Sequence, residues 1–215
     1  MTSFTCALIG NESLLAGCGD TLLGRGHRIT AVVTTDDGLR GWAAKHGLDL
    51  LDAPRDLQPG FDWLLSIANL QVIPDNVLAL AANGAVNFHD GPLPAYAGLN
   101  APNWALINGE ARYGITWHLL EGGIDEGDIL ARRLFDVAAD ETAFSLNSKC
   151  YAAAMDSFGE VITQLESGTP DRTAQDLSQR SYFARAARPA AGGWLDFTRP
   201  SEELARLVRS MDFGG

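Results

Sequence analysis

The chain is poor in cysteine and contains no long apolar run and no cluster of basic residues. Its three cysteines, Cys6, Cys18 and Cys150, are far apart, and no two of them form a CxxC pair. Zinc-ribbon and thioredoxin-like functions are therefore excluded. We expect all three to be small buried side chains in a protein from a reducing compartment.

Membrane and nucleic-acid functions have equally little support. No stretch of about 18 apolar residues, the length that a membrane-spanning helix needs, occurs in the sequence. Residues 1–4 show neither the basic region nor the apolar run of a signal peptide, so we expect a cytoplasmic protein. The net charge of −11 repels phosphate backbones, which argues against nucleic acid as the main partner.

The length and the overall composition suit a single well-packed domain. The 215 residues are 46% hydrophobic and 20% charged. The first hundred alternate between short apolar strands and helices. The predicted strands are 5–9, 29–34, 48–51, 61–67 and 85–89, and the predicted helices are 13–25, 37–46 and 74–82. This alternation is typical of a Rossmann-like, doubly wound α/β fold with a mostly parallel sheet.

The second half of the chain has a different pattern. Strands predicted at 114–121 and 128–137, joined by a Gly-rich loop, indicate a mixed edge of the sheet. Helices are predicted at 101–108, 143–167 and 202–211, and the polar segment 168–189 is predicted to be a surface excursion. In the longest helix the helical spacing predicts a core stripe. Its members are Tyr151, Met155, Phe158 and Ile162.

Asn87, His89 and Asp125 are the candidate catalytic residues. Asn87 and His89 stand two apart at the end of a predicted strand, so their side chains face the same way. The rigid sequence Gly91-Pro92-Leu93-Pro94 follows them, and Asp125 lies in the loop between two later strands. Open α/β sheets bind ligands outside the carboxyl ends of their strands. A lone histidine there is more often structural, but the nearby Asn and the rigid loop favour catalysis.

Acyl transfer to an amine needs these groups. The reaction passes through a tetrahedral oxyanion, which the Asn87 amide and a protonated His89 can stabilise by donating N–H groups. Asp125 can orient the imidazole and relay the proton of the amine.

The same residues resemble the folate-dependent formyltransferases. That family is marked by an Asn-x-His, a Pro-containing loop, a Gly-x-Thr-x-His strand and an Asp-x-Gly. Here these are Asn87-Phe88-His89, Pro92-Leu93-Pro94, Gly114-Ile115-Thr116-Trp117-His118 and Asp125-Glu126-Gly127. Their order and spacing agree throughout, and Trp194-Leu195-Asp196-Phe197 extends the resemblance over most of the chain.

The resemblance implies transfer of a formyl group from 10-formyltetrahydrofolate to an amine, with no metal. The pterin ring would lie in the strand-end cleft, held largely by backbone. The residues implied in binding it are Ser66, Leu70, Ile73, Glu121 and Gly122. Core packing remains an alternative for Leu70 and Ile73, an exposed carboxylate for Glu121, and a simple turn for Gly122.

The sequence of residues 88–102 favours one class of formyl acceptor. It looks most like the formylation domains of nonribosomal peptide synthetases, because Gly91-Pro92-Leu93-Pro94 and Ala97 replace the Ser-Leu-Leu-Pro and the Arg usual in tRNA- and lipid-sugar-modifying members. We therefore predict an aminoacyl group on a peptidyl carrier protein. Three alternatives stay open: formylation of an amino-sugar nucleotide, hydrolysis of the formyl-folate, and a non-catalytic docking domain.

Several other residues have simpler interpretations. Asn11 and Ser13 are expected to cap the helix after the first strand, although the resemblance places this turn on the acceptor side of the cleft. His118 is expected to be structural, or at most to touch a catalytic residue. Trp104 and Trp117 are expected to pack in the core.

The resemblance also suggests a division of the chain. We predict a catalytic domain over residues 1–190. Residues 191–215 would form a linker and helix leading towards a C-terminal barrel-like subdomain that is absent or truncated.

Overall fold

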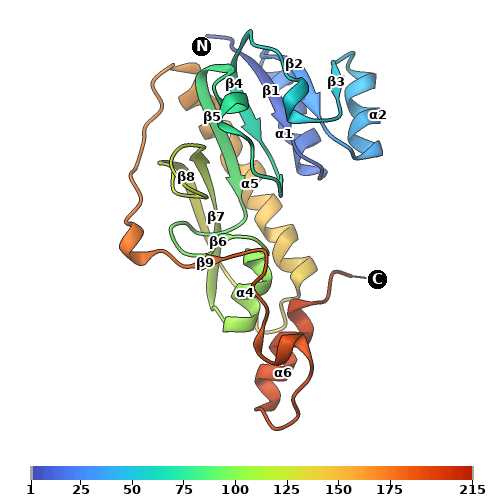
Figure 1. Ribbon diagram of the computed structural model, residues 1–215, viewed down its shortest axis with the longest axis vertical. Helices are drawn as coiled ribbons and strands as arrows, with labels where there is room; N and C mark the ends of the chain where they lie inside the picture. The colour runs from blue at the N-terminus through green and yellow to red at the C-terminus, as the bar shows by residue number, and fades with distance from the viewer. Residues whose placement is uncertain (1, 215) are drawn as a thin grey trace.

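A seven-stranded sheet runs through the centre of the computed structural model, which describes residues 2–214 (Figure 1). Its strands are β1 (Thr5–Ile9), β2 (Arg28–Val33), β3 (Leu50–Leu51), β4 (Phe61–Ser66), β5 (Ala81–His89), β7 (Arg112–Leu119) and β8 (Ile129–Asp136). They lie in the order β3-β2-β1-β4-β5-β7-β8. The first five are parallel, whereas β7 pairs antiparallel with both β5 and β8. The predicted α/β fold with a mostly parallel sheet and a mixed edge is confirmed.

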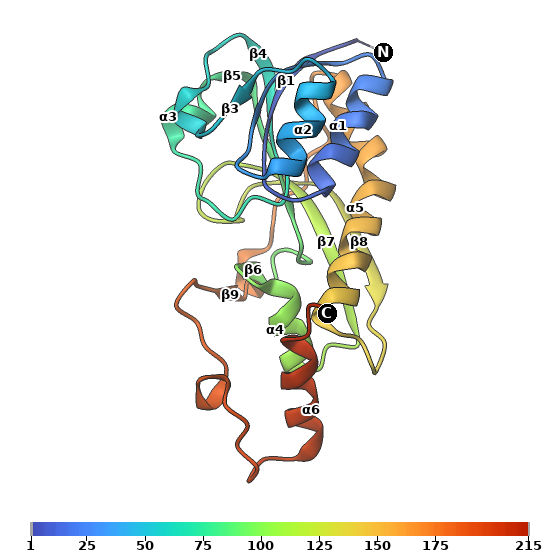
Figure 2. The ribbon, with the colours of Figure 1, turned by 90° about the vertical axis from the view of Figure 1, so that its right-hand side faces the viewer.

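The helices cover the two faces of the sheet unequally. They are α1 (Leu14–Gly24), α2 (Asp37–Lys45), α3 (Asp75–Leu78), α4 (Ala101–Asn108), α5 (Ala143–Glu166) and α6 (Ser201–Ser210), with 3-10 turns η1 (Pro54–Asp56), η2 (Leu177–Gln179) and η3 (Ala190–Gly193). Helices α1, α2 and α5 pack side by side on one face, and short α3 lies on the other (Figure 2). The side with little helical cover leaves room for the loops that follow β4 and β7.

Two predicted elements differ from the structure. The helix predicted over 74–82 ends at Leu78, because residues from Ala81 onward pair with β4 and extend β5. Segment 168–189 is not wholly irregular. It contains β9 (Tyr182–Phe183), which pairs with β6 (Ala97–Gly98). In both places a long-range strand pairing overrides the local pattern.

Most of the residues predicted to pack in the core do so, and Met155 is an exception. Phe158 and Ile162 are fully buried on α5, but Met155 is 37% exposed, so the stripe is narrower than predicted. Trp117 is fully buried and stacks on Phe158, and Trp104 stacks on Phe183, which confirms their packing roles. The three cysteines are also buried, as predicted.

The last helix packs on the body of the molecule. Helix α6 lies against α4, where the Asn103 side chain donates to the Ser210 carbonyl at 2.5 Å. The predicted units 1–190 and 191–215 are described except for residues 1 and 215, which lie outside the described residues. Within residues 2–214 no helix is both long and apolar enough to cross a membrane.

Candidate active site

Three neighbouring strands place polar side chains in one row across the sheet. Ser66 ends β4 and pairs with Asn87 of β5, which pairs with His118 of β7. His89 ends β5, opposite Thr116. Asn87 and His89 are 9% and 5% exposed. These groups therefore gather where β4 and β5 end, which is where parallel sheets bind ligands.

The His89 ring is oriented by a backbone carbonyl. Its Nε2 lies 2.8 Å from the Tyr96 carbonyl oxygen. A carbonyl can only accept, so Nε2 carries a proton. The other nitrogen, Nδ1, lies 3.7 Å from Asp125 Oδ2 and 4.0 Å from Asp90 Oδ1. Gly91 makes this arrangement possible, because a Cβ there would lie 2.6 Å from Nε2. The nitrogen free to exchange a proton is the one that faces Asp125.

Asp125 lies between two histidine rings. Its Oδ2 accepts the Gly98 backbone N–H at 2.8 Å, and its Oδ1 lies 3.4 Å from His118 Nε2. Burial alone would raise the pKa of Asp125. The nearby His89, the hydrogen bond and charge of His118 and the Gly98 N–H outweigh burial and hold that pKa well below its ordinary value. Asp125 is therefore a carboxylate at neutral pH.

His118 takes a larger part than the sequence indicates. Its Nδ1 donates to the Leu119 carbonyl oxygen at 2.8 Å, which directs Nε2 towards Asn87 Nδ2 at 3.2 Å and towards Asp125. His118 therefore connects the amide of Asn87 to the carboxylate of Asp125. The Gly-x-Thr-x-His pattern places Thr116 and His118 near each other, but only the pairing of β5 with β7 brings His118 opposite Asn87.

The loops around these residues have unusual backbone conformations. Four non-glycine residues on them have positive φ: Ala68, Tyr96, Asn100 and Asp125, at 50°, 62°, 57° and 55°. Such conformations cost free energy and persist where the surroundings hold them, commonly at functional sites. Two of these residues, Tyr96 and Asp125, contact His89 directly.

A family model described as formyl transferase matches residues 49–162, which is more than half of the chain and includes Asn87, His89, His118 and Asp125. The chain belongs to the formyl transferase family.

Solved structures agree with this assignment at the level of the fold. WlaRD, a sugar 3N-formyl transferase solved with dTDP and 5-N-formyl-THF, is 18% identical over 98% of this chain and 80% of its own, with a TM-score of 0.83. An N-formyltransferase from Helicobacter canadensis, in complex with folinic acid and dTDP-3-aminofucose, is 19% identical over 97% and 80%, with a TM-score of 0.81. HypX from Aquifex aeolicus, in complex with tetrahydrofolic acid, matches 98% of this chain but only 35% of its own, with a TM-score of 0.73 and 19% identity.

The five residues predicted to bind the donor differ in their exposure and backbone conformation. Ser66 and Ile73 are buried, at 1% and 7% exposure, while Leu70 is 68% exposed, so core packing is wrong for Leu70. Glu121 is an exposed carboxylate that forms an ion pair with Arg172. Gly122 has a φ of +72°, which a turn requires.

The predicted cap of the first helix is wrong for Asn11. Ser13 occupies the N-cap position of α1, but its side chain makes no capping hydrogen bond. Asn11 Oδ1 instead accepts from the Thr34 hydroxyl at 3.1 Å and from the Thr35 N–H at 2.8 Å and hydroxyl at 3.0 Å. The Thr34 and Thr35 donors, which follow β2, occupy this oxygen in place of the helix N–H groups. Asn11 therefore links the loop after β1 to the loop after β2.

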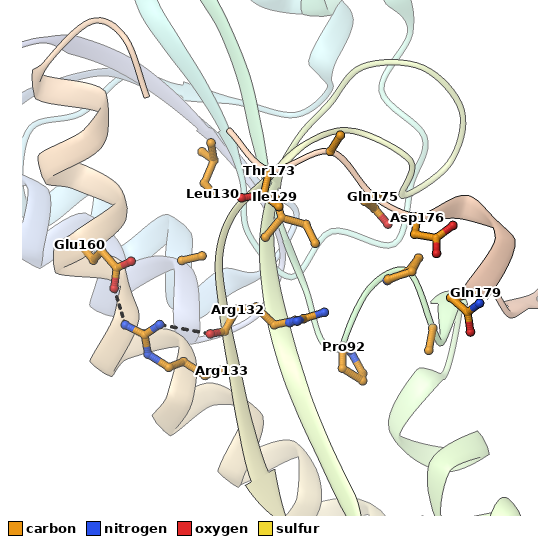
Figure 3. A pocket seen from close by; sticks show the side chains of 14 residues that line it. Pro92, Ile129, Leu130, Arg132, Arg133, Glu160, Thr173, Gln175, Asp176 and Gln179 are labelled. Atoms are coloured by element: carbon orange, nitrogen blue, oxygen red, sulfur yellow. Dashed lines mark hydrogen bonds and ion pairs between the residues drawn. The ribbon is translucent and has the colours of Figure 1, made fainter. Parts of the chain in front are cut away.

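A separate cavity of about 730 Å³ opens beside β8 (Figure 3). It lies between β8, residues 92–95 and residues 173–179, and none of Asn87, His89 and Asp125 is among its lining residues. Arg133, on β8, forms an ion pair with Glu160 at its rim, and Gln175 lies on the opposite wall. The segment that carries Gln175 thus separates this cavity from the Asp125 loop.

Proposed function

We propose that this formyltransferase moves a formyl group from 10-formyltetrahydrofolate to an amine, with Asn87, His89 and Asp125 as its catalytic residues. The observation that carries the proposal is the ionised Asp125 held between His89 and the His118–Asn87 pair. Proton transfer and oxyanion stabilisation are thereby combined at one strand end.

The chemistry divides among the three residues. The amine nitrogen attacks the formyl carbon and a C–N bond forms, while the formyl oxygen becomes an oxyanion. Asn87 has two amide hydrogens, and only one of them faces His118 Nε2, so the other can donate to that oxygen. Protonated His89 donates a charged N–H to the oxyanion. When the tetrahedral intermediate collapses, the bond between the formyl carbon and the folate nitrogen breaks, and His89 gives its proton to that nitrogen. Asp125 relays the proton that the amine loses to His89, which restores the starting protonation state.

The surroundings suit a flat, partly apolar donor. Three large apolar side chains are exposed on the loops after β4 and β7: Leu70, Val72 and Ile124, at 68%, 78% and 47%. Neighbouring exposed apolar side chains commonly mark a binding surface. Similar structures contain 5-N-formyl-THF, folinic acid or tetrahydrofolic acid, which supports a folate donor here.

For the acceptor we propose an aminoacyl group on a peptidyl carrier protein, because residues 88–102 resemble peptide-synthetase formylation domains. A sugar-nucleotide amine is the second candidate. It is favoured by the similar structures, which include a sugar 3N-formyl transferase and a complex with dTDP-3-aminofucose.

An acceptor panel tests these proposals. Purified protein is incubated with 10-formyltetrahydrofolate and aminoacyl-loaded carrier protein, a dTDP-amino sugar, or water alone, and products are measured by mass spectrometry. Formyl-aminoacyl carrier supports the first candidate and formylated sugar the second. Formate release without an amine supports hydrolysis. No product with any acceptor, together with no binding of folinic acid, would support a non-catalytic docking domain.

A further inference from the structure

One segment, residues 172–185, ties together the loops that carry the active site; we name it the strap. Its Thr173 forms an antiparallel bridge with Ile129 at the start of β8. Its Ser181 accepts the Tyr96 N–H through Oγ at 2.8 Å and the Ala97 N–H through its carbonyl at 2.9 Å. The strap thus spans from the β8 edge to the loop whose Tyr96 carbonyl orients His89.

Gln175 of the strap holds the backbone on both sides of the Asp125 turn. Its Nε2 donates to the Asp125 carbonyl oxygen at 2.9 Å and to the Gly127 carbonyl oxygen at 2.6 Å. A primary amide has two N–H groups, and both are used on these two acceptors. Because both partners are carbonyls, only the nitrogen side of the amide can face them. Replacement by a side chain without this amide would leave both carbonyls without this donor.

The turn needs such support because Asp125 adopts a left-handed conformation, with φ of 55°. This conformation costs free energy outside glycine, although aspartate and asparagine adopt it more often than other residues. The Gly98 N–H holds the carboxylate at one end, and Gln175 holds the main chain at the other. Both contacts are needed to keep Asp125 pointing between His89 and His118.

Neighbouring strap residues secure the flanks of the same loop. Arg180 donates to the Ile124 carbonyl at 2.9 Å and lies 3.5 Å from the Glu126 carboxylate. Arg172 forms ion pairs with Glu121 and Asp128. Ion pairs at exposed sites contribute little each, so the bonds to main-chain carbonyls from Gln175 and Arg180 determine the shape of the loop.

We propose that Gln175 is a positioning residue, which sets the geometry of Asp125 relative to His89 and His118 without touching substrate. The inference rests on the proposed function only in linking that geometry to rate. A displacement of about 1 Å in a catalytic group can reduce the rate about 100-fold. The effect should fall on the chemical step, because the Gln175 bonds hold the Asp125 turn, whereas the exposed Leu70 and Val72 lie on the loop after β4.

Gln175→Met tests this, since methionine keeps the length and volume of the side chain but has no N–H. The matched control is Gln179→Met, on the same strap, whose amide donates only to the Ser178 hydroxyl among residues 2–214. We expect kcat to fall about 10- to 100-fold in Gln175→Met with the KM for donor and amine within about twofold, and wild-type values in Gln179→Met. A kcat within about twofold of wild type in folded Gln175→Met would overturn the proposal.

A second measurement does not depend on activity. The ¹³Cγ resonance of Asp125, followed against pH, reports its ionisation. In wild type it should stay constant from pH 7 to about 4, because the pKa of Asp125 is well below the ordinary value. In Gln175→Met it should begin to titrate below about pH 5, because the carboxylate loses its histidine neighbours.

The two measurements separate the possible failures. A wild-type protein without transferase activity but with the expected shift of the Asp125 titration would refute the proposed function and keep the positioning role. An unchanged titration would overturn the positioning role. Gln175→Asn, which keeps the amide but is one methylene too short to reach both carbonyls, should behave like Gln175→Met. If neither variant folds, the role is structural and the proposal is wrong.

Discussion

The Thr116 hydroxyl fastens the loop after β5 to β7 through Leu93. Thr116 Oγ1 accepts the Leu93 N–H at 3.0 Å and donates to the Gly91 carbonyl oxygen at 2.8 Å, with Thr116 and Leu93 both fully buried. One side chain thus satisfies a donor and an acceptor in a loop that lacks regular hydrogen bonding. Because Gly91 contacts the His89 ring, this bond also fixes the wall behind that ring.

Thr116→Val should therefore lower both stability and activity. Valine has nearly the same shape but removes both hydroxyl bonds, so the Leu93 N–H and the Gly91 carbonyl keep only the 3.1 Å bond to each other. The loss of a buried hydrogen bond costs about 0.5–1.5 kcal/mol. Urea denaturation measures the free energy of unfolding, and kcat reports the displacement of His89. Thr116→Ser keeps the hydroxyl and should lose less on both measures. A larger loss in Thr116→Ser than in Thr116→Val would show that packing of the methyl group, rather than the hydrogen bond, dominates.

The placement of Asn87 and His89 at one strand end could be predicted from the sequence, because this placement depends on local rules. Asn87 and His89 stand two apart, so their shared face follows from the strand period alone. His118 is different. Its contact with Asn87 depends on the antiparallel register of β5 and β7, which no local pattern encodes. The sequence therefore identifies His118 as part of a motif but does not predict its contact with Asn87.

Asp125→Asn tests the role of the carboxylate. The amide keeps the size of the side chain but removes the charge between His89 and His118. We expect kcat to fall about 10²- to 10⁴-fold, the usual contribution of a positioned proton-transfer group. Asp136→Asn, on an exposed carboxylate at the end of β8, should keep wild-type activity. Retention of more than about a tenth of the wild-type kcat in Asp125→Asn would remove Asp125 from the proton transfer.

The pKa of Asp125 also limits what a pH profile can show. This pKa lies well below the ordinary value, so Asp125 stays ionised from pH 5 to 9, about one unit or more above the ordinary aspartate pKa. We therefore expect any change of kcat within that range to come from another group. Asp125→Asn should lower the profile as a whole without removing either of its limbs. A profile whose acid limb disappears in this variant would contradict the assignment of the carboxylate as always ionised.

Gly127→Ala and Gly123→Ala form a matched pair on the Asp125 loop. A Cβ on Gly127 would lie 1.9 Å from the Leu119 carbonyl oxygen, a backbone atom of the sheet that cannot move independently. A Cβ on Gly123 would meet the Glu126 carboxylate at 2.5 Å, but that side chain can rotate away. We expect Gly127→Ala to cost about 1–3 kcal/mol and to reduce kcat, as overpacking usually does. Gly123→Ala should be close to neutral, and equal melting temperatures would contradict this difference.

The structure of the strap could not be predicted from local sequence patterns. Residues 172–185 are polar, without helical or strand periodicity, and they were predicted only as a surface excursion. Their structure comes from individual side-chain bonds to distant main-chain groups, such as Gln175 to Asp125. The wrong prediction for Asn11 has the same cause. Its local preference for a helix cap is overridden by Thr34 and Thr35, more than twenty residues away.

Protonation of the unfolded chain at His27 should make the folded protein less stable at pH 5 than at pH 7. Burial lowers the pKa of His27 and the charge of Arg25 adds to this, although the hydrogen bond and charge of Glu166 oppose it. The His27 Nδ1 accepts the Phe4 N–H at 3.2 Å, which requires an unprotonated nitrogen. The unfolded chain binds a proton near the ordinary pKa of 6.5, whereas the folded chain resists it. Stability therefore falls as pH drops below that value, by at most about 1.4 kcal/mol per pH unit for one proton.

His27→Gln can still accept from Phe4 and donate to Glu166 but cannot titrate, so its unfolding free energy between pH 7 and 5 should fall less steeply than in wild type. His46→Gln, a substitution of a partly exposed histidine after α2, should keep the wild-type slope. Parallel slopes for wild type and His27→Gln would show that His27 titrates alike in the folded and unfolded chains.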